Sequence, residues 1–208
     1  MFELIREENT FEPALNLARD AAYLHETGAA RARVWRNDRC VVLGRFLEPE
    51  DEVHLGKAEE MGIPVLKRIS GGGAVYQDLG NINYSLYLDA ESLPARGVSE
   101  SMRVLSYPVT SLLESLGISW DWVPPNNVYV AGRKISGSAQ AWRRGRLLHH
   151  GTLLVACDLK TMDALLKPGG RSRIAPVINL GEVAGGIEVE RVEELLSETV
   201  LEGAAGLQ

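Results

Sequence analysis

Residues 67–85 have the sequence KRISGGGAVYQDLGNINYS, in which three glycines interrupt two segments that otherwise have the pattern of β-strands. The segment before the glycines, residues 63–66, is apolar, and the segment after them alternates apolar and polar side chains. Glycine weakens a strand because it loses more backbone entropy on folding and offers no side chain to pack. Three consecutive glycines therefore predict a turn where a ligand comes close to the main chain.

This turn has the chemistry of an anion site. Backbone N–H groups in a glycine-rich turn form a concave site for anions. Arg68 adds a planar, permanently charged side chain that suits a carboxylate or a phosphate. A glycine-rich strand connection with a surface arginine would have the same sequence, so these residues alone leave both interpretations open.

A second segment carries a candidate catalytic lysine. Residues 126–140 read NNVYVAGRKISGSAQ, and the alternation of Val128 to Val130 followed by Ala-Gly predicts a β-hairpin. Lys134 would then lie near the start of the second strand, where its charge could be placed between a carboxylate and a phosphate. Preorganised charge is usually the largest contribution to acyl-transfer and phosphoryl-transfer rates. A solvent-exposed strand lysine is the alternative.

Several motifs, in their order and spacing, resemble the lipoate–protein ligase family, which has the biotinyl/lipoyl protein ligase fold. They cover most of the chain: VWRND (34–38), VVLGR (41–45), the two segments above, HHGTLL (149–154), RSRI (171–174) and Asn179-Leu180. Members of that family use ATP to activate a carboxylic acid, lipoate or octanoate, as an acyl-adenylate. The acyl group then passes to a lysine of a carrier domain. The resemblance implies this activity here, with ATP and Mg²⁺ as cofactors and lipoate as substrate.

The resemblance also implies roles for individual residues. Lys134 is the implied catalytic residue, bridging the acyl carbonyl and the α-phosphate. The implied lipoate and acyl-adenylate site consists of Arg68, Ser70, Gly71, Gly72, Gly73, Ala74, Val75 and Tyr76. The implied nucleotide site consists of Gln77, Asn81, Asn83, Asn126, Asn127, Ser136, Gly137, Ser138, Ala139, His150, Gly151 and Thr152. The implied partner is a lipoyl carrier domain, either an H-like protein of glycine cleavage or the acyltransferase subunit of a 2-oxoacid dehydrogenase.

Two positions depart from the family pattern. The family commonly has Asn-Asp where this chain has Asn126-Asn127, and hard cations prefer carboxylate oxygen. Asn127, the candidate metal ligand, offers only a neutral carbonyl, which predicts weaker Mg²⁺ binding. Gln77 stands where the family often has histidine, so hydrogen bonding is kept and a titratable group is lost.

Chain length predicts one domain. With 208 residues and 45% hydrophobic composition, residues 1–208 are expected to form a single catalytic domain. Many ligases of this family add a C-terminal accessory domain of roughly a hundred residues. The residues from Ile187 onward have the pattern of a single helix, so we expect no accessory domain here. We expect a separate small protein to supply it.

Composition and charge argue against nucleic acid and a membrane as partners. A net charge of −6 and a pI near 5.3 argue against nucleic acid, because phosphate binding needs basic surface. No apolar run approaches the roughly 18 residues of a membrane span, and the acidic start does not resemble a signal peptide. Cys40 and Cys157 lie in apolar segments without metal-binding or disulfide spacing, so both are expected to be buried thiols. A cytoplasmic protein is the expectation.

The pattern along the chain predicts an α+β fold with a mixed, largely antiparallel sheet flanked by helices. Strands are expected at 32–36, 40–44, 63–67, 82–88 (half-buried), 118–123, 128–130, 134–142 and 147–156. Helices are expected between Thr10 and Gly28, at 52–61, at 98–117 with a kink at Pro108, at 162–167 and after 187. Strand alternation lets only one of His149 and His150 face a site. Arg143, Arg144 and Arg146 would form a solvated hairpin tip or a patch that docks an acidic carrier.

Other functions remain open. An ATP-independent transferase could move an octanoyl or lipoyl group between carriers, but relatives of that kind use a cysteine shortly before the Gly-Arg-Lys segment. Residues 119–127, SWDWVPPNN, contain none. A protein that kept the acyl pocket and lost catalysis is supported by Asn127 alone. Biotin ligation has least support, because the Gly-Arg-Gly-Arg type of adenylate loop is absent.

Overall fold

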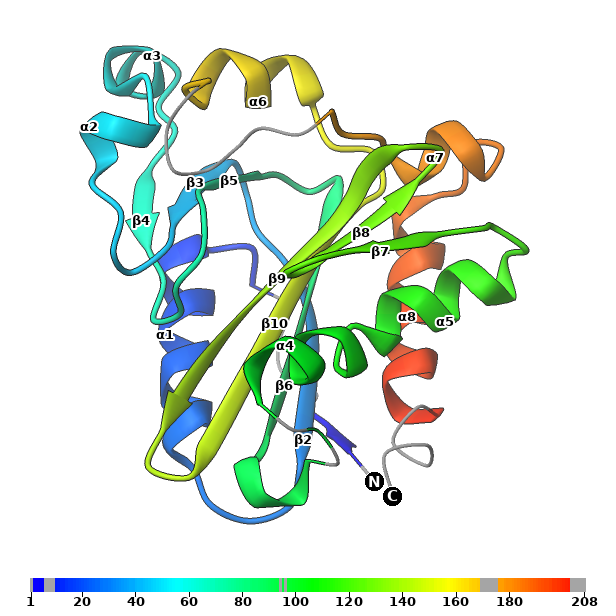
Figure 1. The fold of residues 1–208 in the computed structure, drawn as a ribbon. Coiled ribbons are helices and arrows are strands. Elements are labelled where there is room, and N and C mark those ends of the chain that lie inside the picture. The colour runs from blue at the N-terminus through cyan, green and yellow to red at the C-terminus, as the bar shows by residue number, and fades with distance from the viewer. Residues whose placement is uncertain (1, 6–9, 94, 96, 169–175, 203–208) are drawn as a thin grey trace.

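The chain folds into two β-sheets with helices on their outer faces (Figure 1). The computed structural model describes residues 2–5, 10–93, 95, 97–168 and 176–202. A seven-stranded sheet has the order β1-β2-β6-β10-β9-β8-β7, and a three-stranded sheet has the order β4-β3-β5. Within the described residues, the β1–β2 and β3–β4 pairs are parallel and the other strand pairs are antiparallel. The predicted α+β class with a mixed, largely antiparallel sheet is confirmed.

The strands follow the predicted order closely. The large sheet contains β1 (Glu3–Leu4), β2 (Arg31–Arg36), β6 (Asn81–Asp89), β7 (Asp121–Val123), β8 (Asn127–Val130), β9 (Arg133–Arg143) and β10 (Arg146–Leu154). The small sheet contains β3 (Cys40–Leu43), β4 (Val65–Lys67) and β5 (Val75–Gln77). The predicted β8–β9 hairpin is confirmed, and it turns through Ala131 (φ 49°) and Gly132 (φ 74°). Positive φ at both central residues is typical of the tight turns that match strand twist.

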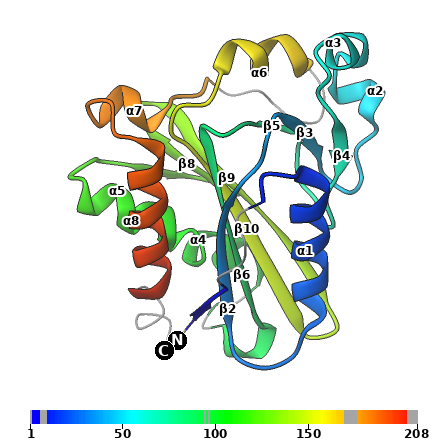
Figure 2. The same ribbon diagram turned by 180° about the vertical axis from the view of Figure 1, so that it is seen from behind.

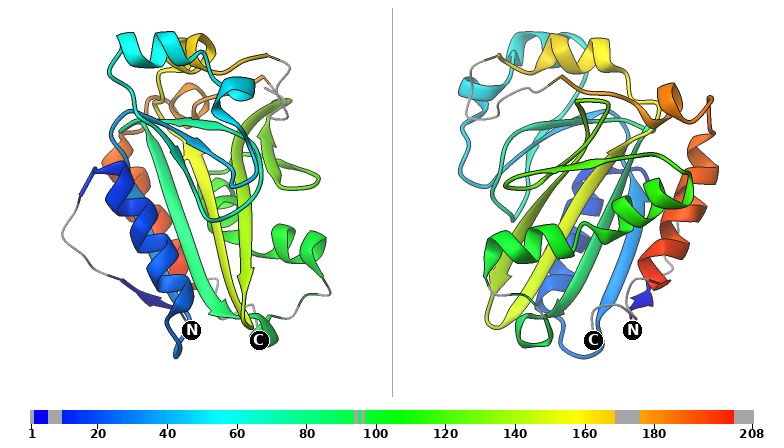
Figure 3. Two further views of the ribbon diagram at one scale, coloured as in Figure 1. Left: turned by 90° about the vertical axis from the view of Figure 1, so that its left-hand side faces the viewer. Right: turned by 45° about the vertical axis from the view of Figure 1, so that its right-hand side comes forward.

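Helices surround both sheets. They are α1 (Pro13–His25), α2 (Pro49–Glu52), α3 (Leu55–Glu60), α4 (Val98–Val104), α5 (Tyr107–Ser115), α6 (Leu159–Leu165), α7 (Leu180–Val183) and α8 (Val189–Glu202), with a 3₁₀ turn η1 (Ala90–Ser92). Helix α1 packs on one face of β6 and β10, and α4 and α5 lie on the other face (Figures 2 and 3). Helix α8 packs against α5, β1 and β2. Among the described helices, none is long and apolar enough to cross a membrane.

The two larger of the three hydrophobic clusters among the described residues support the two sheets. The larger cluster lies between the large sheet and helices α5 and α8, and it includes Ile82, Leu86, Leu112 and Leu196. The smaller cluster joins the three-stranded sheet to α3 and α6 through residues such as Val41 and Leu165. The small sheet therefore packs as a separate layer over one end of the large one (Figure 1).

Two segments that were each expected to form one continuous helix are interrupted in the structure. The expected helix 52–61 is divided into α2 and α3, because Val53 is extended and the neighbouring His54 N–H donates to the Leu165 carbonyl at 2.9 Å. The expected helix 98–117 is broken into α4 and α5 rather than kinked. Pro108 lies in the first turn of α5, where its missing N–H costs nothing, and its ring would collide with a carbonyl of a continuous helix.

The strand expected at 82–88 alternates as predicted, but it is buried on both faces rather than half-buried. In β6, every residue from Asn81 to Leu88 is buried. Its apolar side chains face the larger hydrophobic cluster, whereas the hydroxyls of Ser85 and Tyr87 bond to Asp20 of α1 at 2.9 and 2.5 Å. The prediction of a half-buried strand is wrong because α1 covers the polar face of β6. The short elements β1 and α7 were not predicted.

Candidate functional site

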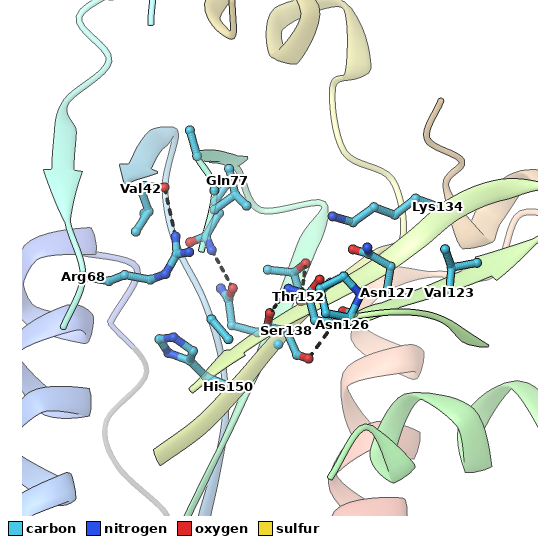
Figure 4. Close-up of a pocket in the computed structure, with 18 of the residues that line it drawn as sticks. Val42, Arg68, Gln77, Val123, Asn126, Asn127, Lys134, Ser138, His150 and Thr152 are labelled. Carbon is cyan, nitrogen blue, oxygen red and sulfur yellow. Dashed lines mark hydrogen bonds between the residues drawn. The ribbon is translucent and has the colours of Figure 1, made fainter. Parts of the chain in front are cut away.

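A cavity of about 750 Å³ lies where the two sheets meet (Figure 4). It has the size usual for small-molecule sites. The predicted site residues that line it are Arg68, Gly73, Ala74, Val75, Gln77, Asn83, Asn126, Asn127, Lys134, Gly137, Ser138, Ala139, His150, Gly151 and Thr152. Segments from both sheets thus converge, although they are far apart in the sequence.

The remaining predicted residues lie beside the cavity. Ser70 is buried and bonds to His150, and Gly71 and Gly72 continue the glycine-rich turn. Asn81, Ser136 and Tyr76 are buried, and Tyr76 packs in the cluster of the small sheet rather than lining the cavity. The candidate residues 171–174 lie outside the described part of the chain.

Lys134 enters the cavity from the start of β9, directly after the β8–β9 turn. Its side chain runs over Gly137, where an added Cβ would lie 2.7 Å from the lysine Nζ. No acceptor for this Nζ is found within the described residues. Lys134 is half-buried, not exposed, and burial, with the charge of Arg68 as a smaller cause, lowers the pKa of Lys134 to about 8. Among the described residues, the ammonium group therefore has no acidic side chain as a counter-charge.

Arg68 stabilises the glycine-rich turn from inside. Its Nε donates to the Ser70 Oγ at 2.9 Å, and its two terminal nitrogens donate to the carbonyls of Val42 at 3.2 Å and Gly71 at 2.7 Å. Gly72 has a φ of 91°, and a Cβ there would lie 2.8 Å from the Arg68 guanidinium. Burial lowers the pKa of Arg68 to about 10, so the side chain stays charged at neutral pH.

The cavity is electropositive and of mixed polarity. Figure 4 shows Lys134 and Asn127 on one side and Arg68, Val42 and His150 on the other. The described residues that line it include no aspartate and no glutamate, so the two cations favour an anionic ligand. Apolar side chains of Leu17, Trp35 and Val75 also line it. An amphiphilic acid fits this combination.

Buried amides hold Asn83 at the cavity wall. The Gln77 carbonyl oxygen accepts from the Asn37 amide at 2.8 Å, and the Gln77 amide donates to the Asn83 oxygen at 2.7 Å. Asn81 donates to the same oxygen at 3.2 Å. The Asn83 side-chain nitrogen is buried and has no acceptor among the described residues. An unsatisfied buried donor is costly, so Asn83 is suited to donate to a ligand.

The described lining of the cavity does not fit a metal ion held by protein side chains alone. Within the described residues, no group of three His, Cys, Asp or Glu side chains could hold a metal ion. Asn126 donates to the Ser138 carbonyl, and Asn127 offers a neutral amide oxygen beside Gly137. Mg²⁺ strongly favours carboxylate and phosphate oxygens. A Mg²⁺ ion arriving with a nucleotide would therefore be held by its phosphates.

The two histidines of β10 have separate environments, as the alternation predicts. His150 lines the cavity, and its ring nitrogens lie 2.8 Å from Asp20 Oδ2 and 2.6 Å from Ser70 Oγ. His149 lies on the opposite face, between Tyr84 and Gln140. Burial, followed by the charge of His150, lowers the pKa of His149 to about 3, so this imidazole is neutral.

Two other groups of residues lie away from the cavity. Cys40 and Cys157 are free, buried thiols, as predicted, and neither lines it. Arg144 lies in the β9–β10 turn, at the far end of these strands from the cavity (Figure 1). Arg146 is not part of a solvated tip, because it is buried and pairs with Asp89 at 2.8 Å.

Sequence reasoning missed the contribution of α1. Leu17 lines the cavity, and Asp20 contacts His150. A signal was present: Asn16, Asp20 and Leu24 recur at a spacing of four, so two polar residues share the buried face of an amphipathic helix.

The fold and the cavity define a domain whose cavity, between two sheets, has the lining that suits an amphiphilic anion. The chain belongs to the family described as the lipoyl protein ligase A/B catalytic domain, which matches residues 12–201. A candidate lipoate-protein ligase A of Aeropyrum pernix is 36% identical over 90% of this chain and 74% of the relative. Lipoate–protein ligase 1 of Staphylococcus aureus is 28% identical over 95% of this chain and 62% of the relative. The chain thus spans roughly two thirds of the length of these two relatives.

Solved structures share the fold over nearly the whole chain. A structure from a study of a bi-partite lipoate protein ligase and its E2 lipoyl domain, from the archaeal lipoylation system of Thermoplasma acidophilum, has a TM-score of 0.85 and 28% identity over 98% of this chain and 84% of its own. A T. acidophilum protein with bound lipoic acid has a TM-score of 0.85 and 26% identity, covering 99% and 86%. A lipoate-protein ligase A bound with ATP has a TM-score of 0.85 and 28% identity, covering 98% and 85%.

Proposed function

We propose that this chain is the catalytic part of an ATP-dependent lipoate–protein ligase. It activates lipoate or octanoate as an acyl-adenylate and transfers the acyl group to a lysine of a lipoyl carrier domain. The observation that carries the proposal is the pair of cations, Lys134 and Arg68, on opposite sides of one cavity whose described lining has no carboxylate. Relatives named as lipoate–protein ligases, and similar structures with bound lipoic acid or ATP, support it.

In the activation step, the acid carboxylate attacks the α-phosphorus of ATP and pyrophosphate leaves. The aliphatic part of the acid lies against Leu17, Val42 and Val75, and the glycine-rich turn borders it. Lys134 draws the carboxylate and the α-phosphate together, because both carry negative charge. Bringing the reactants into contact in a water-poor cavity replaces a bimolecular encounter and is a major source of rate.

In the transfer step, the carrier lysine attacks the acyl carbonyl and AMP leaves. Negative charge grows on the carbonyl oxygen, and the Lys134 ammonium stabilises it. The attacking amine gives up a proton as the amide forms. The unpartnered Asn83 amide and the Thr152 hydroxyl are proposed donors to the nucleotide, with the small residues 137–139 allowing its close approach to β9.

Acid binding is expected to weaken as pH rises through about 8. The Lys134 ammonium titrates near that pH in the free protein, whereas Arg68 stays charged to about pH 10. Above the pKa, the protonated fraction falls about tenfold per pH unit. Calorimetric measurement of the lipoate dissociation constant from pH 6.5 to 9.5 checks this. A flat profile would show that the Lys134 charge does not bind the acid.

A second polypeptide is proposed to assist activation. The T. acidophilum relative is bi-partite, and the cavity of this chain offers no carboxylate for Mg²⁺ among its described lining residues. The isolated chain is then expected to release pyrophosphate slowly with lipoate and Mg-ATP, but to acylate a carrier domain rapidly from synthetic lipoyl-adenylate. Rapid pyrophosphate release by the chain alone would refute the need for a second subunit.

The alternatives have less support. An ATP-independent carrier-to-carrier transferase needs a nucleophile, and no cysteine is among the described residues that line the cavity. A non-catalytic acyl-binding homologue would bind lipoate and transfer nothing. The same two-stage assay separates it from a ligase, because it would fail with lipoyl-adenylate as well as with lipoate.

A further inference from the structure

Asp20 is a carboxylate in the protein interior that binds residues from three strands. Its Oδ1 accepts hydrogen bonds from Arg33 at 3.1 Å, Ser85 at 2.9 Å and Tyr87 at 2.5 Å, and its Oδ2 lies 2.8 Å from the His150 Nδ1. Burial raises the pKa of Asp20, but the hydrogen bond and charge of His150 and the charge of Arg33 outweigh it, and the pKa is lowered. The carboxylate is therefore ionised at neutral pH and accepts on both oxygens.

A continuous chain of hydrogen bonds leads from Asp20 to the glycine-rich turn. Because the carboxylate can only accept, the His150 Nδ1 carries a hydrogen, and the Nε2 lies 2.6 Å from the Ser70 Oγ. The Ser70 hydroxyl accepts from Arg68 at 2.9 Å, and Arg68 donates to the Gly71 carbonyl at 2.7 Å. Each group is therefore held by the one before it.

The glycine-rich turn, where these hydrogen bonds end, is tightly packed. The Arg45 N–H donates to the Ser70 carbonyl at 2.8 Å. An added Cβ at Gly44 would lie 2.0 Å from the Gly72 carbonyl oxygen, so the two backbones are in direct contact. A run of three glycines has high conformational entropy when it is unrestrained. Its single arrangement here depends on contacts of this kind.

We propose that Asp20 and His150 are positioning residues that hold the Ser70 hydroxyl, and through it Arg68, so that the glycine-rich turn has its acid-binding shape before the acid arrives. The inference rests on the proposed function for the identity of the ligand, but not for the hydrogen-bond chain itself. A turn that is ordered in advance does not lose that entropy on binding, which raises affinity.

A nucleophilic role for Ser70 fits the geometry less well. Serine, histidine and aspartate bonded in this order are also the arrangement that activates a nucleophilic serine. Ser70 is 1% exposed and does not line the cavity, and its oxygen already accepts from Arg68. The hydroxyl therefore holds the turn and is not presented to a substrate.

Two variants interrupt the chain of hydrogen bonds at different points. Asp20→Asn keeps the size of the side chain but has one acceptor oxygen, so it cannot accept from both His150 and Arg33. Ser70→Ala removes the hydroxyl alone. His149→Gln is the matched control, because this buried imidazole is adjacent in sequence but bonds to Tyr84 and Gln140 on the opposite face of β10.

Amide hydrogen exchange in the ligand-free protein tests the proposal without any assumption about function. Exchange of the Arg45 amide is expected to accelerate about tenfold or more in Asp20→Asn and in Ser70→Ala, and to stay unchanged in His149→Gln. Unchanged exchange in both test variants would overturn the proposal. If Asp20→Asn does not fold, His150→Gln takes its place beside Ser70→Ala.

Lipoate affinity then tests the link to binding. Each single variant is expected to raise the lipoate dissociation constant about tenfold. The Asp20→Asn/Ser70→Ala double variant is expected to bind lipoate no more weakly than the weaker-binding single variant, because both substitutions act through one hydroxyl. Additive losses of binding free energy in the double variant would contradict the proposed chain of hydrogen bonds. Failure of the wild-type chain to bind lipoate would refute the proposed function. The exchange measurement would still show whether the hydrogen bonds from Asp20 order the glycine-rich turn.

Discussion

Lys134→Ala is expected to lower the rate of carrier acylation by about a hundredfold or more, the usual loss when one preorganised donor to a developing oxyanion is removed. The ammonium has no acceptor within the described residues, and it lies over Gly137 on the wall of the cavity. Its charge is thus available to the carboxylate, the α-phosphate and the acyl carbonyl. Transfer from synthetic lipoyl-adenylate and activation of lipoate should both be slowed.

The fold should tolerate this change. Because burial depresses the pKa of Lys134, the unfolded chain binds its proton more tightly than the folded protein does between about pH 8 and its ordinary value of 10.5. The charged lysine therefore opposes folding at neutral pH, and this effect is relieved as pH rises through that window. Thermal unfolding at pH 7 should show no loss of stability in Lys134→Ala. Lys160→Ala, at an exposed position of α6, controls for loss of a charge, and wild-type rates in Lys134→Ala would refute the mechanism.

Gly72→Val is expected to abolish measurable lipoate binding. Gly72 has a φ of 91°, a region that a β-branched residue avoids, and its Cβ would lie 2.8 Å from the Arg68 guanidinium. The substitution would therefore strain the backbone and displace Arg68 from the Gly71 carbonyl. Calorimetry with lipoate measures the loss.

Gly97→Val separates strain from the local effect. Gly97 has a nearly identical φ of 92° and precedes α4, and no atom of another described residue lies within 4 Å of an added Cβ there. It should lose comparable stability and keep its lipoate affinity. Equal affinity losses in the two variants would show that Gly72 acts only through global stability, and unchanged affinity in Gly72→Val would make the segment an ordinary turn.

Local sequence patterns were sufficient for the parts of the site that are local. Glycine favours turns because its backbone adopts conformations that other residues avoid. The Ala-Gly pair therefore predicted the β8–β9 hairpin and the position of Lys134 on β9. Alternation along β10 separated His149 from His150, because successive side chains of a strand point to opposite faces of the sheet.

The tertiary parts could not be predicted in this way. Asp20 and His150 are 130 residues apart, and no periodicity within one element pairs them. The burial of both faces of β6 depends on α1 covering its polar side, and the break between α2 and α3 depends on contacts of Val53 and His54 with α6 and the residue after it. Packing against distant elements decided each of these outcomes, as it commonly overrides local preference.

Mass spectrometry of a carrier domain tests whether this chain transfers a lipoyl group and whether Lys134 is needed for the transfer. The purified chain is incubated with a lipoyl carrier domain and either synthetic lipoyl-adenylate or lipoate with Mg-ATP, in parallel with Lys134→Ala. We expect the carrier to gain one lipoyl group from lipoyl-adenylate in the presence of the wild-type chain, and a far smaller fraction of it to be lipoylated in the presence of the variant. A carrier of unchanged mass after incubation with the wild-type chain and lipoyl-adenylate would contradict it.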